Sequence, residues 1–161
     1  MIVIQSYSLG TSSVRAANPL VKVRLACDPT RPEESLLEVE YPSASADPSA
    51  RDVWCDAENR DWTGSTGITF QIKPSDTEKL SVSFFDRNRV AYTTWVVLHG
   101  SSWQPVRVRF DALRPNPHFQ PPDAKAGSLL DVSDVCGIAF APHHPGPGQL
   151  VLSPLMLFTS E

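Results

Sequence analysis

The aromatic side chains carry the most informative chemistry in this sequence. Sugar rings present flat C–H patches on their faces and hydroxyl groups at their edges, so an aromatic face beside polar side chains can stack on the first and hydrogen-bond the second. Aromatic residues also build cores, and we interpret Trp62, Trp95 and Trp103 as core or loop anchors. The aromatic residues spread over strand-like segments and their ends are Tyr41, Trp54, Trp62, Phe85, Tyr92, Trp95, Trp103 and Phe119.

Signatures of catalysis are weak by comparison. The GxSxG pattern of a serine nucleophile is missing, and Ser101 and Ser102 fall in a segment that we interpret as a hairpin turn. Glycoside hydrolysis needs two carboxyl groups that meet only in space. Asp56, Asp61 and Asp86 stand at the ends of predicted strands, so a sugar-active enzyme is kept as the third-ranked hypothesis, and no residue is assigned as catalytic.

The cysteines give no metal-binding pattern. Cys27, Cys55 and Cys136 lie far apart, and no CxxC or Cys/His ligand spacing includes them. Each falls in an apolar, strand-like run, so we interpret them as small buried thiols. One disulfide with a leftover thiol is the alternative.

Length and charge limit the classes of partner. A chain of 161 residues fits one domain, which we expect to span residues 1–161. The formal charge is −4 and neither Lys nor Arg forms a run, which argues against a nucleic-acid partner. No stretch approaches the ~20 apolar residues of a membrane span, and the start has no basic segment of a signal peptide. We expect a cytoplasmic chain if the sequence is complete, and an extracellular one if it is an excised module.

The apolar pattern predicts an all-β fold. Apolar residues recur with period two in segments separated by Gly, Pro, Asp and Asn, which is typical of an antiparallel β-sandwich. Alternation places Ile68, Phe70 and Ile72 on one inner face, while Phe85, Tyr92, Arg107 and Arg109 are expected on the solvent face of one sheet. The predicted strands are 2–6, 20–27, 35–41, 53–56, 67–73, 79–86, 90–98, 104–110, 135–141 and 149–158.

Several short motifs, taken in order, resemble the family-11 carbohydrate-binding modules, a group of galactose-binding-like jelly rolls. The similarity covers roughly residues 35–158. The motifs are Leu-Leu-Glu-Val-Glu-Tyr (36–41), Asp-Trp-Thr (61–63), Gly-Ile-Thr-Phe-Gln-Ile-Lys (67–73), Leu-Ser-Val-Ser-Phe-Phe-Asp (80–86), Ser-Ser-Trp-Gln-Pro-Val-Arg-Val-Arg-Phe (101–110), Gln-Pro-Pro (120–122) and Leu-Asp-Val-Ser-Asp-Val-Cys-Gly-Ile-Ala-Phe (130–140).

The resemblance implies a non-catalytic module that binds a polysaccharide of the β-glucan type in a cleft on the concave sheet. It also places part of the site in the loop before Gln-Pro-Pro, where the family carries Arg, Asp and Tyr and this chain has Asn116, His118 and Phe119. The charge-assisted hydrogen bonds of the family are therefore lost at these positions. On this basis we expect three stacking platforms, Trp54, Tyr92 and Phe119, with polar partners Asp56, Arg89, Arg107 and His118.

Two further expectations follow from the same resemblance. In the family, an acidic opening segment and a closing Asp help to hold calcium. This chain has residues 1–6, without acids, and Ser153 at these places. We therefore expect a weak calcium site or none, and no other cofactor. The related jelly roll of complex I intermediate-associated proteins provides the alternative function, an assembly module with a protein partner.

Overall fold

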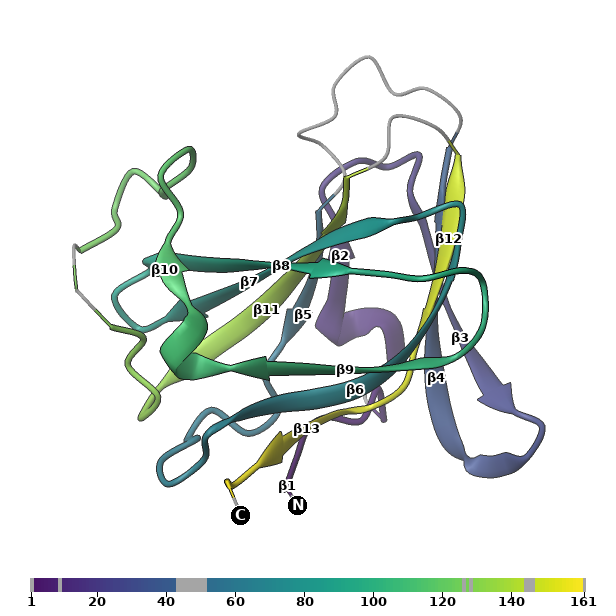
Figure 1. Cartoon of the computed structure of the whole chain (residues 1–161), viewed down its shortest axis with the longest axis horizontal. Helices are drawn as coiled ribbons and strands as arrows, with labels where there is room; N and C mark the ends of the chain where they lie inside the picture. Colours follow the sequence, from purple (N-terminus) through teal and green to yellow (C-terminus); the bar gives the residue numbers. More distant parts are fainter. Residues whose placement is uncertain are drawn as a thin grey trace.

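The computed structural model describes residues 2–8, 10–42, 52–125, 127, 129–143 and 147–160. Its strands form two antiparallel sheets that lie face to face (Figure 1), which confirms the predicted all-β sandwich of the jelly-roll kind. The seven-stranded sheet has the order β1 (Ile2–Gln5), β13 (Leu155–Phe158), β6 (Gly67–Ser75), β12 (Gly148–Leu152), β4 (Arg31–Tyr41) and β3 (Lys22–Asp28), with β9 (Gln104–Arg109) also paired to β6.

The second sheet has six strands. Its middle strands β7 and β11 pair over seven matched positions, and β8 and β5 extend it on the two sides. The six strands, in spatial order, are β10 (Arg114–Pro115), β8 (Ala91–Val97), β7 (Lys79–Asp86), β11 (Val135–Pro142), β5 (Val53–Asp56) and β2 (Val14–Ala16).

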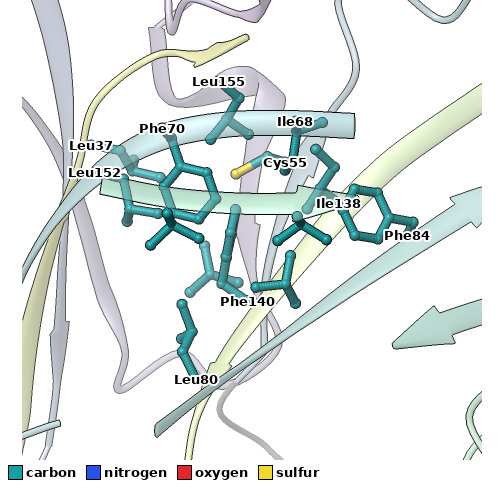
Figure 2. Packing of buried hydrophobic residues seen from close by; sticks show 14 of the residues in the cluster. Leu37, Cys55, Ile68, Phe70, Leu80, Phe84, Ile138, Phe140, Leu152 and Leu155 are labelled. Carbon is teal, nitrogen blue, oxygen red and sulfur yellow. The ribbon is translucent and has the colours of Figure 1, made fainter. Parts of the chain in front are cut away.

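One hydrophobic core fills the space between the sheets, because each strand directs alternate side chains inward. Figure 2 shows this packing, with Phe70 of β6 and Phe140 of β11 meeting from opposite sheets. Their ring centroids are 5.6 Å apart in an edge-to-face arrangement, which is a favourable geometry for aromatic pairs. The inward positions predicted for β6, Ile68, Phe70 and Ile72, are all buried.

Besides shifts of a few residues at strand ends, the strands differ from the predicted segments in three places. The short edge strands β2 and β10 were not predicted, and the segment 149–158 is divided into β12 and β13. Ser153 lies at that division, where its Oγ accepts a hydrogen bond from the backbone N–H of Gln71 at 2.8 Å. Its own N–H donates to the Gln71 carbonyl at 3.0 Å. Ser153 therefore bridges the break in strand pairing with one side-chain and one backbone hydrogen bond.

All three cysteines are free thiols, and they occupy different environments. Cys55 is buried in the core, Cys136 is half-buried on β11, and Cys27 is exposed on the edge strand β3. The prediction of small buried thiols therefore holds for Cys55 and is wrong for Cys27, because the outer side of an edge strand has no neighbour to cover it. Across the described part of the chain, no helix has the length and apolarity that crossing a membrane requires.

Candidate functional site

The outer face of the six-stranded sheet has a low floor along β11. Its outward positions are Gly137, Ala139 and Ala141, because the alternate residues Ile138 and Phe140 are buried in the core. Larger side chains stand on both flanking strands, β5 and β7. A ligand with a flat face can therefore approach the backbone of β11 closely.

Two aromatic rings flank the small residues of β11 at one end of the strand. Trp54 of β5 and Phe85 of β7 reach toward each other across Gly137, with ring centroids 4.8 Å apart and planes tilted by 53°. A Cβ atom on Gly137 would lie 2.3 Å from Cζ2 of Trp54. The indole therefore lies directly against this glycine, and a residue with a side chain does not fit beneath it.

An ion pair fixes the outer edge of the indole. Arg15 of β2 donates two hydrogen bonds to the carboxylate of Asp56, at 3.1 and 2.9 Å. The same carboxylate accepts the indole N–H of Trp54 at 2.5 Å, and the Arg15 guanidinium lies 5.8 Å from the centre of the indole ring. Bidentate pairs of this kind have a defined geometry, so the aromatic surface is held in one orientation with polar groups beside it.

The proline-rich loop after β10 carries Phe119 over the same end of the sheet. The Asn116 side chain turns this loop by accepting the backbone N–H groups of His118 and Phe119, at 2.9 and 3.2 Å. Gln120 then fixes it to β8, because its side-chain amide hydrogen-bonds both the N–H and the carbonyl of Ala91, at 2.9 and 3.0 Å. The Phe119 ring itself is 57% exposed.

The turn between β7 and β8 completes this end of the site. Buried Asp86 accepts the backbone N–H groups of Asn88 and Asp131, both at 3.0 Å. Arg89 follows with a φ of 60°, a left-handed conformation that is unfavourable for a residue with a side chain. Its guanidinium is exposed and lies 3.4 Å from the carboxylate of Asp123 in the facing loop.

Residues of these elements line a groove of about 550 Å³ that is open to solvent. Its surface combines the aromatic faces of three residues with two arginines and two carboxylates. The residues that line it are Arg15, Ala16, Ala17, Asp52, Trp54, Phe85, Asp86, Arg89, Phe119, Pro121, Pro122, Cys136 and Ala139.

Burial alters the acid–base behaviour of two groups in the groove. The pKa of Asp52 is raised because its carboxylate is partly removed from water. Burial likewise raises the pKa of the Cys136 thiol, although the nearby Arg60 opposes this effect. Cys136 is therefore a protonated, weakly reactive thiol at neutral pH and does not have the character of a nucleophile.

Four of the seven predicted site residues lie at the groove. Trp54, Arg89 and Phe119 line it, and Asp56 borders it through its bonds to Arg15 and Trp54. His118 is exposed in the same loop as Phe119 but is not among the lining residues. A role of these residues in binding stays a prediction.

Two predicted site residues are in the wrong place for this groove. Tyr92 is only 1% exposed, and its hydroxyl donates to the carbonyl of Leu129 at 2.9 Å, so its ring belongs to the core. The register explains this, since Tyr92 alternates with Thr93, which faces outward. Arg107, like Arg109, lies on β9 of the other sheet, where its guanidinium covers the ring of Phe158 at 4.0 Å.

The sequence interpretation also missed or misplaced several side chains. Arg15 was not considered because β2 is too short to give an apolar pattern. Phe85 was correctly expected on a solvent face from alternation along β7, but it was not included among the site residues. Trp62 is buried as expected, but Trp95 is 50% exposed on β8 and is neither a core nor a loop residue. Trp103 is 42% exposed in the loop before β9, so it is not part of the core. Alternation within β8 contained the signal for Trp95, because it lies two residues after Thr93 on the same face.

The calcium expectation is not tested by the present structure. Ser153 stands where the family's closing Asp was expected, and its hydroxyl is engaged with the backbone of Gln71 and Pro154. Among the described residues no group of three or more His, Cys, Asp or Glu side chains is arranged to hold a metal ion.

Comparison with known proteins gives a consistent result for the family and the fold. The family described as "Carbohydrate binding domain (family 11)" matches residues 28–160. A family 11 carbohydrate-binding module from Clostridium thermocellum, solved in complex with a β-1,3-1,4-mixed-linked tetrasaccharide, is 16% identical and has a TM-score of 0.72, with 99% of this chain and 98% of that chain covered. A search of curated proteins found no match.

More distant structures share the same architecture. A family 30 carbohydrate-binding module is 13% identical with a TM-score of 0.60, covering 92% of this chain and 83% of that chain. An exo-β-agarase matches 100% of this chain with only 26% of its own length, at 11% identity and a TM-score of 0.64. At these identities the similarity establishes the fold.

Proposed function

The chain belongs to family 11 of the carbohydrate binding domains, and from this premise we propose that it binds a polysaccharide without altering it. The binding site is the groove on the outer face of the six-stranded sheet. Trp54, Phe85 and Phe119 supply the faces on which sugar rings stack. Arg15, Asp56 and Arg89 supply hydrogen bonds to the hydroxyl groups at the ring edges.

The arrangement of Trp54 and Phe85 is the observation that carries this proposal. The two rings meet over Gly137, the orientation of the Trp54 indole is fixed by the Arg15–Asp56 pair, and both rings line a groove of about 550 Å³. A cluster of aromatic rings at a solvent-open groove is more informative than a single exposed apolar residue, because contiguous exposed apolar surface marks interaction sites. A rigid aromatic surface costs little conformational entropy on binding, which favours recognition of a flat ring.

The charges in the groove favour a neutral glycan. Arg15 is paired with Asp56, and Arg89 lies beside Asp123, so each cation has an anionic neighbour. The family 11 module that was solved with a mixed-linked glucan tetrasaccharide points to the same class of ligand. We therefore propose a β-linked glucan as the ligand.

Two of the carboxylates near the groove, those of Asp56 and Asp86, are engaged in structural contacts, which supports binding without catalysis. Asp56 holds Arg15 and Trp54, and Asp86 is buried with two backbone N–H donors. A glycosidase needs one carboxylic acid and one carboxylate free to act on the bond between two sugars. Neither aspartate can leave its contacts without disturbing the groove itself.

The proposal is tested by affinity electrophoresis of the purified chain through gels that contain β-glucans or unrelated polysaccharides. We expect retardation by one class of glycan and at least a tenfold weaker interaction for Trp54→Ala and Phe119→Ala. Arg107→Ala, on the opposite sheet, is the matched control and should bind normally. Incubation with the retarding glycan should release no reducing ends.

Absence of retardation by every glycan would contradict carbohydrate binding, and the assembly-module alternative would then come first. Release of reducing ends by the wild type, lost in Asp56→Asn, would instead identify an enzyme.

A further inference from the structure

A further aromatic side chain lies on the same sheet face, outside the groove, and it is more exposed than the half-buried Trp54 and Phe85. Trp95 on β8 is 50% exposed and is paired with Ser81 of β7, which in turn is paired with Ala141 of β11. Because these three residues occupy one row across the strands, their side chains point to the same side of the sheet. Trp95 therefore faces the same solvent as Trp54 and Phe85.

The Trp95 ring is held by two neighbours. The ammonium group of Lys79 lies over the ring, 4.7 Å from its centre, and the His143 ring meets it edge-on with centroids 5.3 Å apart. Lys79 is two residues from Ser81, on the side away from Ser83 and Phe85. A cation over one ring face limits rotation of the indole, so half of its surface is presented to solvent in a fixed position.

The surface between Trp95 and Trp54 is low and polar. The residues between them on β11 and β7 are Ala139, Ala141, Ser81 and Ser83. The Ser83 and Thr93 hydroxyls are hydrogen-bonded at 2.8 Å, and Asn116 donates to Thr93 at 3.2 Å. These groups can exchange hydrogen bonds with sugar hydroxyls. Three inter-strand steps and one two-residue step separate the two residues, which places their Cα atoms about 16 Å apart.

We propose that Trp95 is a second stacking platform for the same polysaccharide, which crosses β11 and β7 between the groove and Trp95. This inference rests on the proposed function and extends it, because it requires a ligand of several sugar residues. The low floor allows the chain to lie on the sheet between the two aromatic sites. Short oligosaccharides fill only the groove, and longer ones gain a contact at Trp95.

The test is calorimetric titration with β-linked gluco-oligosaccharides of two to six residues. For the wild type we expect affinity to rise by about tenfold once the oligosaccharide is long enough to reach Trp95. Trp95→Ala should lose this increase and keep the wild-type affinity for the short ligands. Trp103→Ala removes another exposed tryptophan and should retain the increase, and all variants should give the wild-type circular dichroism spectrum.

A second variant tests the path of the polysaccharide over the sheet. Ala141→Leu places a larger side chain on the floor between the two tryptophans, and it should weaken the long ligands selectively while leaving Trp95 intact. If the wild type and Trp95→Ala bound oligosaccharides of every length with equal affinity, the inference about Trp95 would be overturned. The proposed function of the groove would still stand. Failure of the wild type to bind any length would overturn the proposed function and this inference with it.

Discussion

At the residue scale, the groove depends on a few side chains whose contacts fix their orientation. Trp54 is held by Asp56 and lies on Gly137, while Phe119 is placed by the turn at Asn116. Tyr92 has the same aromatic chemistry but faces the core, since it stands one position away from the outward-facing Thr93. Residue type alone therefore did not distinguish a platform from a core residue, whereas alternation along β8 would have done so.

Arg89 provides a prediction at this scale. Its left-handed backbone favours glycine, so Arg89→Gly should leave the free energy of unfolding unchanged or raise it by up to about 1 kcal/mol. The same change removes a guanidinium from the groove and should weaken glycan binding several-fold. Urea unfolding and calorimetric titration measure the two effects.

Arg87→Ala is the matched control, because Arg87 lies on the same turn, pairs with Asp131 at 2.7 Å and does not line the groove. We expect it to bind glycan normally. If Arg89→Gly bound as well as the wild type, Arg89 would have no part in the site.

At the element scale, the site depends on the small residues of β11 and on two connections, the β7–β8 turn and the loop after β10. The strands that form the sheet were predictable because most alternate cleanly between apolar and polar residues. The connections were not, since their shape depends on side-chain hydrogen bonds such as those of Gln120 to Ala91. The edge strands β2 and β10 are too short for any periodicity to appear.

Gly137→Ala tests the role of β11. The new methyl group would overlap the Trp54 indole at 2.3 Å and the Cys55 carbonyl at 2.8 Å. We expect a loss of about 1–3 kcal/mol in the free energy of unfolding, as for other overpacking changes, and weaker glycan binding because the indole is displaced. Chemical denaturation and affinity electrophoresis provide the measurements.

The double variant Gly137→Ala with Trp54→Ala separates the two clashes. Removing the indole should recover part of the lost stability, because only the contact with the Cys55 carbonyl then remains. If Gly137→Ala destabilised the wild type and the Trp54→Ala variant equally, the indole would not pack against Gly137 as described.

At the scale of the whole molecule, the sandwich provides a dry core on one side of each sheet and a separate outer face for the ligand. The predicted segments placed both faces correctly where alternation was complete, as in β6 and β7. They could not show which sheet carries the groove, because strand order depends on long-range pairing. Arg107 was assigned to the wrong sheet for this reason.

The buried thiol of Cys55 reports on the core as a whole. Burial raises the pKa of this thiol to about 12, against about 8.5 in an unfolded chain. Its contribution to stability is therefore present below pH 8.5 and is lost as the pH rises toward 12, because only the unfolded chain releases the proton. Between pH 8.5 and 10, the wild type should lose about 1.6 kcal/mol more unfolding free energy than Cys55→Ala. Urea unfolding at each pH measures this difference. Equal losses of unfolding free energy in the two proteins would show that the thiol is accessible to water in the folded state.

The indole N–H signals of the four tryptophans in a proton–nitrogen NMR spectrum test the central claim most directly, because they report on different parts of the molecule. On titration with a β-glucan oligosaccharide, the Trp54 signal should shift strongly, since its N–H lies at the groove beside Asp56. The signals of buried Trp62 and of Trp103 should stay in place. Saturable binding that leaves Trp54 unchanged, or that shifts mainly residues of the seven-stranded sheet, would contradict the assignment of the groove as the carbohydrate site.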